Sequence, residues 1–156
     1  MRDSSVCLDE LMPFIRERLA AGESVSFSPH GRSMRPMIVG GRDSVVLSPL
    51  PKKLKKYDLP LYQRENGQYV LHRIVKTKDG YTCIGDNQFV FEHGLQHKQM
   101  IAVVTSFVHN GKTYSTDCLS YKVYCRLWHY IRPFRYVFAV VRNKPNSTFR
   151  KTGGAE

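Results

Sequence analysis

The spacing of apolar residues changes near residue 22, and this change constrains the fold more than any other feature of the chain. Leu8, Leu11, Ile15 and Leu19 recur at intervals of three and four, which predicts a helix over 5–21 that ends at Gly22. Beyond it, short runs of β-branched and aromatic residues alternate with Gly, Pro and Asn, a pattern typical of strands. The runs cover residues 25–28, 44–48, 59–63, 69–76, 81–84 and 101–109.

Two turn signals separate neighbouring runs. Asn66-Gly67 lies between the third and fourth runs, and Asp79-Gly80 lies between the fourth and fifth. Both dipeptides tolerate the positive φ of a tight hairpin turn. We therefore expect a mainly β fold, a coiled, barrel-like domain of short strands with a helix at each end.

The 156 residues suffice for one domain, which we place at 1–117 with its β core at 24–109. The longest apolar runs, 100–104 and 136–141, are too short to cross a bilayer. The first residues carry no apolar segment of the secretory type, so we expect a cytoplasmic protein. Cys7, Cys83, Cys118 and Cys125 have no metal-ligand spacing and are expected to be free thiols, with no metal and no cofactor.

Three residues could supply the chemistry of acyl transfer. Ser33 follows a glycine turn, His72 lies inside a strand-like run, and Asp86 lies in a Gly-Asp-Asn turn. A serine hydroxyl needs a nearby base, and the base needs an orienting carboxylate. On spacing alone the favoured interpretation of His72 is a buried core residue, because it shares a strand face with Val70 and Ile74. Asp86 is equally a residue that braces its own turn.

Other charged residues receive structural interpretations. Asp43 and Asp58 are expected to form turns at strand starts, while Glu92 and His93 are expected to be surface groups. Arg73 points away from His72 on the opposite strand face, and we expect it to be a structural ion-pair partner.

The serine motif, Gly31-Arg32-Ser33-Met34-Arg35-Pro36, resembles a box of the signal-peptidase and LexA-like serine peptidases. Four further boxes follow in that family's order, so that the resemblance covers roughly residues 24–107: Asp43–Leu47, Tyr57-Asp58, His72–Val75 and Gly85–Asn87. The resemblance implies a LexA/signal-peptidase-type β domain without the membrane anchor of true signal peptidases. No DNA-binding helix-turn-helix precedes the core, which disfavours a repressor.

The same resemblance implies roles for particular residues. Ser33 would be the nucleophile, and His72 stands where the bacterial branches carry a lysine base. A histidine there is similar to the endoplasmic-reticulum-type signal peptidases, in which Asp86 would match the carboxylate. Gly31 replaces a serine that lines the oxyanion hole in some members, so backbone N–H groups around Gly31, Ser33 and Met34 would bind the oxyanion.

These features together predict a serine endopeptidase that cleaves an extended peptide or leader segment through an acyl-enzyme. Two alternatives remain at this point. The first is a non-catalytic module of the same fold that binds a peptide, and the second is a protease that cleaves itself near Ala20-Ala21-Gly22.

The C-terminal segment 118–143 is predicted to form a basic, aromatic-rich amphipathic helix broken at Pro133, followed by a disordered tail at 144–156. Either this helix packs on the domain's own sheet, or it lies on an anionic membrane surface. The second arrangement would make the protein peripheral to the inner membrane. The net charge of +11 includes a run of lysines at 52–56. No recognition-helix or RNA-binding pattern accompanies it, so no nucleic-acid partner is expected.

Overall fold

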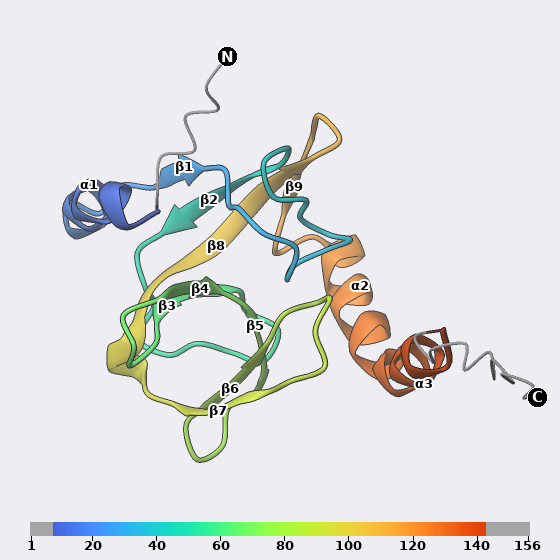
Figure 1. Cartoon of the computed structure of the whole chain (residues 1–156). Helices are drawn as coiled ribbons and strands as arrows, with labels where there is room; N and C mark the ends of the chain where they lie inside the picture. Colours follow the sequence, from blue (N-terminus) through green and yellow to red (C-terminus); the bar gives the residue numbers. More distant parts are fainter. Residues whose placement is uncertain (1–7, 143–156) are drawn as a thin grey trace, which may run out of the picture.

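The structure is a computed structural model, and it describes residues 8–142. The helices of this part are α1 (Leu8–Ala20), α2 (Leu119–Tyr130) and α3 (Arg132–Arg142) (Figure 1). The strands are β1 (Val25–Phe27), β2 (Ser44–Ser48), β3 (Pro60–Gln63), β4 (Tyr69–Leu71), β5 (Arg73–Lys76), β6 (Tyr81–Ile84), β7 (Glu92–Leu95), β8 (Met100–His109) and β9 (Lys112–Ser115). A short 3₁₀ helix, η1 (His97–Gln99), precedes β8.

The strands form two antiparallel sheets that do not close into a barrel. One sheet has the order β1-β2-β8-β3-β4, with β9 also paired to β8, and the other has the order β5-β6-β7. Helices make up 29% of the described residues and strands 30%, so the fold is mixed and the prediction of a mainly β fold needs correction. The difference arises because the strands other than β8 are short, whereas each of the three α-helices has 11 to 13 residues.

The long strand β8 organises the larger sheet. It pairs with β2 on one side and with β3 on the other, and its inward residues include Met100, Ala102 and Val104. Helix α1 packs Met12 and Ile15 against the same core. The helix ends as expected at Gly22, which has φ +81° and donates its N–H to the Leu19 carbonyl.

The predicted strand over 69–76 is divided at His72. Residues 69–71 pair with β3 in the larger sheet, whereas Arg73 and Ile74 pair with β6 in the smaller one. His72 therefore lies where the chain passes from one sheet to the other, and it is 2% exposed. Side chains do not alternate here between a buried and an exposed face, because Leu71 and Arg73, the two neighbours of His72, are buried as well.

Both predicted hairpins are confirmed. Gln63 pairs with Tyr69 across the Asn66-Gly67 turn, and Gly67 has φ +88°. Asp79 and Gly80 both have positive φ between β5 and β6.

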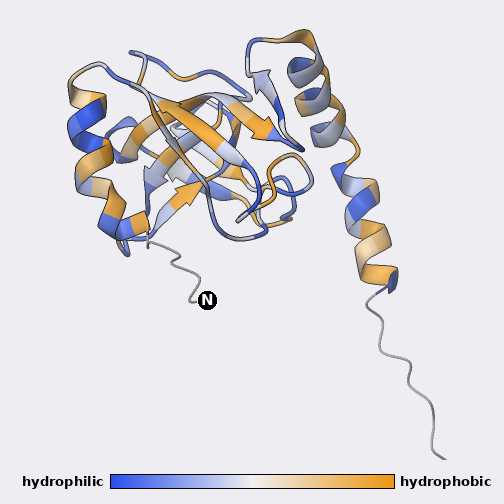
Figure 2. Ribbon diagram, turned by 90° about the horizontal axis from the view of Figure 1, so that it is seen from above, coloured by the Kyte–Doolittle hydropathy of each residue, from blue (hydrophilic) through white to orange (hydrophobic). Residues whose placement is uncertain are grey.

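The C-terminal segment forms two helices that lie on the opposite side of the molecule from α1 (Figures 1 and 2). The predicted break falls at Ile131 rather than at Pro133, because Pro133 occupies the first turn of α3, where its missing N–H costs nothing. Within residues 8–142, no helix is both long and apolar enough to cross a membrane. The predicted disordered tail lies outside the described residues.

Candidate functional site

Ser33 lies in the loop between β1 and β2, and close backbone packing shapes that loop. Gly31 has φ +97°, a conformation that favours glycine. A Cβ on Gly40 would come within 2.5 Å of the Gly31 carbonyl oxygen, so the two segments can approach only because residue 40 has no side chain. Met34 is buried, and its carbonyl accepts the Ile38 N–H at 3.0 Å, which anchors the turn after Ser33.

Hydrogen bonds join the Gly85-Asp86-Asn87 turn to the Ser33 turn. The Asn87 N–H donates to the Ser33 carbonyl at 2.7 Å, and the Asn87 side chain donates to the Arg32 carbonyl at 3.3 Å. A Cβ on Gly85 would lie 2.7 Å from the Ser33 carbonyl oxygen. The structure thus joins two motifs that are separated by about fifty residues of sequence.

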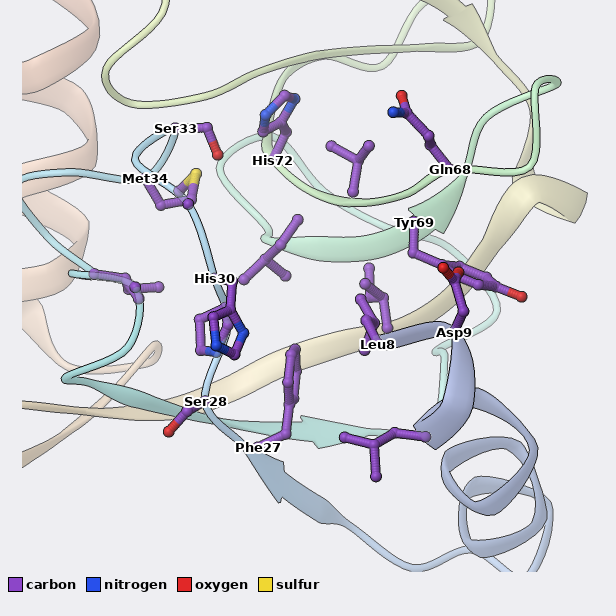
Figure 3. Close-up of a pocket in the computed structure, with 18 of the residues that line it drawn as sticks. Leu8, Asp9, Phe27, Ser28, His30, Ser33, Met34, Gln68, Tyr69 and His72 are labelled. Atoms are coloured by element: carbon purple, nitrogen blue, oxygen red, sulfur yellow. The ribbon is translucent and has the colours of Figure 1, made fainter. Parts of the chain in front are cut away.

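Ser33 and His72 line the same cavity, which has a volume of about 760 Å³. Figure 3 shows the Ser33 hydroxyl on the side of the turn that faces the His72 ring. Among the described residues no hydrogen bond joins the two side chains. Other lining residues include Leu8, Leu11, Phe27, Ser28, Ile38, Leu61, Arg64, Tyr69 and Leu71.

The imidazole of His72 is fixed through one nitrogen. Its Nδ1 lies 3.0 Å from a carboxylate oxygen of Glu92 and 3.3 Å from the Tyr62 hydroxyl. Burial lowers the pKa of His72, and the Glu92 carboxylate only partly offsets that effect. The ring is therefore held neutral at physiological pH, with Nε2 as the nitrogen not engaged by Glu92.

Glu92 is the site residue that sequence reasoning missed, and its interpretation as a surface group was wrong. Its carboxylate also accepts from Arg64, with Nε at 2.8 Å from Oε2. Burial raises the pKa of Glu92, but the hydrogen bonds and the positive charge of Arg64 oppose that effect, and the pKa is lowered on balance. No local signal marked this residue, because β7 is short, contains Gly94 and shows no alternation.

Asp86 does not contact His72 in the structure. Its two carboxylate oxygens each lie 2.8 Å from Arg73, from Nε and Nη2 respectively, and Tyr124 donates to Oδ2 at 3.3 Å. We therefore correct the prediction that Asp86 orients His72. The physical reason is that the Arg73 guanidinium binds both carboxylate oxygens of Asp86, so the carboxylate is engaged away from His72.

The structural interpretation of Arg73 is confirmed. Arg73 is 2% exposed and Asp86 is fully buried, and the guanidinium also donates to the Tyr121 hydroxyl at 2.8 Å. The pair thereby connects β5, the Gly-Asp-Asn turn and α2. Asp43 and Asp58 are turn residues as expected, since their carboxylates accept the Val39 and Lys55 backbone N–H groups.

Searches for related proteins return no family model, curated protein or solved structure that matches this chain, so its function is inferred from the site itself.

Proposed function

We propose that the chain is a serine endopeptidase of the signal-peptidase/LexA-like type, with a coiled β core that is an open, two-sheet variant of that fold. The observation that carries the proposal is the convergence of Ser33 and His72 on one cavity from two distant motifs. A cytoplasmic location remains part of the proposal.

In this mechanism the Ser33 Oγ attacks the carbonyl carbon of the substrate peptide bond. His72 Nε2 accepts the hydroxyl proton and passes it to the departing amine, leaving an acyl group on Ser33. Water then attacks the acyl-enzyme, again with His72 as the base, and releases the acid. Glu92, rather than Asp86, orients the imidazole through Nδ1 and stabilises its protonated form.

The oxyanion would be bound by backbone N–H groups of the Gly31–Met34 turn. Two observations support a rigid turn: the Asn87 N–H holds the Ser33 carbonyl at 2.7 Å, and Gly40 allows the 30–31 backbone to pack closely. Donors that are fixed before the reaction stabilise a developing charge most effectively.

The substrate would be an extended peptide. β1 and β4 are edge strands of the larger sheet, and residues of both line the cavity. Edge strands present unpaired backbone groups that can pair with a further strand. The lining around Ser33 includes Phe27, Ile38 and Leu61, which favours apolar side chains next to the scissile bond.

A peptide-binding module without catalysis is the second candidate, and one observation favours it: no hydrogen bond joins Ser33 to His72 in the described chain. Catalytic hydrogen bonds are often long in unliganded enzymes and tighten with substrate. The two candidates differ in product, because a binding module leaves the peptide intact.

Digestion of a mixture of extended peptides, read by mass spectrometry, tests the proposal. The wild type should yield defined cleavage products, and Ser33→Ala should yield none. Ser28→Ala is the matched control, since Ser28 also lines the cavity and should be dispensable. Retention of a peptide without cleavage by both the wild type and Ser33→Ala would support the binding module instead.

A further inference from the structure

Helix α3 is packed with its polar side inward and its apolar side outward. Arg132 is 6% exposed, and the Arg135 guanidinium stacks 3.7 Å from the centre of the Trp128 ring. By contrast, Phe134 is 77% exposed and Phe138 is 68% exposed. A helix that packs on its own domain normally shows the reverse arrangement.

Helix α2 also exposes apolar side chains. Tyr121 and Cys125 are buried on its inner side, while Leu119, Val123 and Leu127 are largely exposed at intervals of four. We call the exposed apolar side chains of the two helices the outer apolar face: Leu119, Val123, Leu127, Phe134, Val137, Phe138 and Val141. Exposed apolar surface of this extent marks an interaction site.

The charge around the outer apolar face indicates which kind of partner this face binds. Residues 119–142 contain five Lys or Arg residues, and neither Asp nor Glu occurs among them. The lysine-rich loop at 52–56 adjoins α2, because Lys56 and Arg126 both lie over the ring of Tyr57. A second copy of this basic surface would be repelled, whereas an anionic lipid surface would be attracted.

A cavity of about 480 Å³ lies where α2 meets α3, and two of its lining side chains have buried nitrogen atoms that make no hydrogen bond within residues 8–142. Its walls include Phe89, Phe91, Tyr130 and Tyr136, and the side chains of His129 and Arg132 line it. Among the described residues, His129 Nδ1 and Arg132 Nε and Nη1 are buried and make no hydrogen bond. Asp86, the nearby carboxylate, already pairs with Arg73, so Arg132 lacks a compensating anion.

We propose that the outer apolar face docks on an anionic phospholipid membrane, with the phosphate of a lipid headgroup bound by Arg132 in this cavity. Tyr130 and Tyr136 are more than half exposed and would lie at the headgroup level, where amphipathic rings are favoured. The inner side of the same two helices contacts the turn beside Ser33, since Trp128 and Arg135 both donate to the Asp86 carbonyl.

Flotation of the full chain with vesicles tests the proposal. Vesicles of phosphatidylglycerol and phosphatidylcholine in equal parts should retain the protein at low salt and release it as salt rises, whereas pure phosphatidylcholine should retain little. Phe134→Ser and Phe138→Ser together should lower the partition coefficient about 100-fold, roughly tenfold for each phenylalanine removed from the lipid. The matched control is Phe14→Ser, because Phe14 is 51% exposed on α1, and it should bind like the wild type.

Arg132→Met tests the headgroup site separately. It should reduce the preference for anionic vesicles about tenfold, as expected for the loss of charged hydrogen bonds. It should leave the urea midpoint unchanged or raised, because a buried guanidinium that lacks an acidic partner is removed.

Four results would overturn the proposal: equal binding to both vesicle types, no vesicle binding, an unchanged lipid preference in Arg132→Met, and self-association that Phe134→Ser abolishes. Binding of inorganic phosphate at Arg132 without vesicle binding would also overturn it, since a free ion would then be the ligand.

Discussion

Replacing Asp86 with Asn should destabilise the fold rather than remove a catalytic carboxylate. Asp86 is fully buried and Arg73 is 2% exposed, and two contacts of 2.8 Å join them. Asparagine has nearly the same shape and retains one acceptor oxygen, but it leaves the Arg73 charge without a counter-charge.

The structure gives a magnitude for this effect. Removing one partner of a buried ion pair costs about 3–5 kcal/mol, and we expect the lower end because asparagine keeps one acceptor. With a urea dependence of about 2 kcal/mol per molar, a loss of about 3 kcal/mol lowers the unfolding midpoint by about 1.5 M. A domain of this size has a total stability of about 5–15 kcal/mol, so much of the protein should still fold.

Urea unfolding followed by circular dichroism measures the effect, and Asp79→Asn is the control, because Asp79 is exposed in a turn that asparagine tolerates. In a double-mutant cycle, Asp86→Asn should cost much less when Arg73 is already replaced by Met. An unchanged midpoint in Asp86→Asn, together with lost peptidase activity, would refute this reasoning and restore the catalytic role of Asp86.

Three further predictions concern the site. Glu92→Gln should lower peptidase activity about 100-fold or more, because glutamine neither fixes the His72 tautomer nor stabilises its charged form. It should lower the urea midpoint less than Asp86→Asn does, because the Arg64–Glu92 ion pair is only partly buried. Unchanged activity would exclude Glu92 as the orienting group. Burial lowers the pKa of His72, so the imidazole stays neutral at pH values below the ordinary pKa of histidine. Both activity and stability should therefore decline only as the pH falls below about 6.5. An acid limb of the pH–rate profile centred above about pH 6.5 would contradict the assignment of His72 as the base. Gly85→Ala should reduce activity and cost about 1–3 kcal/mol of stability, because the new Cβ would lie 2.7 Å from the Ser33 carbonyl oxygen; wild-type activity in this variant would show that the two turns need not touch.

The strands and hairpins with local signals could be predicted from the sequence. β-branched runs and the Asn66-Gly67 and Asp79-Gly80 turns identified most of β1 to β6, since alternation and positive φ are local properties. β7 and β9 were missed because they are short and rich in polar residues. The division of the fourth run at His72 was missed because a crossing between sheets depends on distant partners.

The candidate site could likewise be predicted only in part from the sequence. Ser33 and His72 could be proposed from their motifs, and they line one cavity. The carboxylate could not be assigned, because whether Asp86 or Glu92 reaches His72 depends on how β5 and β7 each pair with β6 in the smaller sheet. The inverted packing of α3 was equally hidden, because the stripe of apolar residues is the same whichever side faces the protein.

Covalent labelling of Ser33 by a fluorophosphonate is the most direct test of the central claim that this cavity is a serine peptidase site. The labelled peptide, mapped by mass spectrometry, should be the one that contains Ser33, and the label should persist in Ser28→Ala. His72→Gln should abolish labelling while the protein remains folded, because glutamine cannot accept the serine proton. No label on the wild type, a label on another serine, or undiminished labelling of His72→Gln would contradict the account.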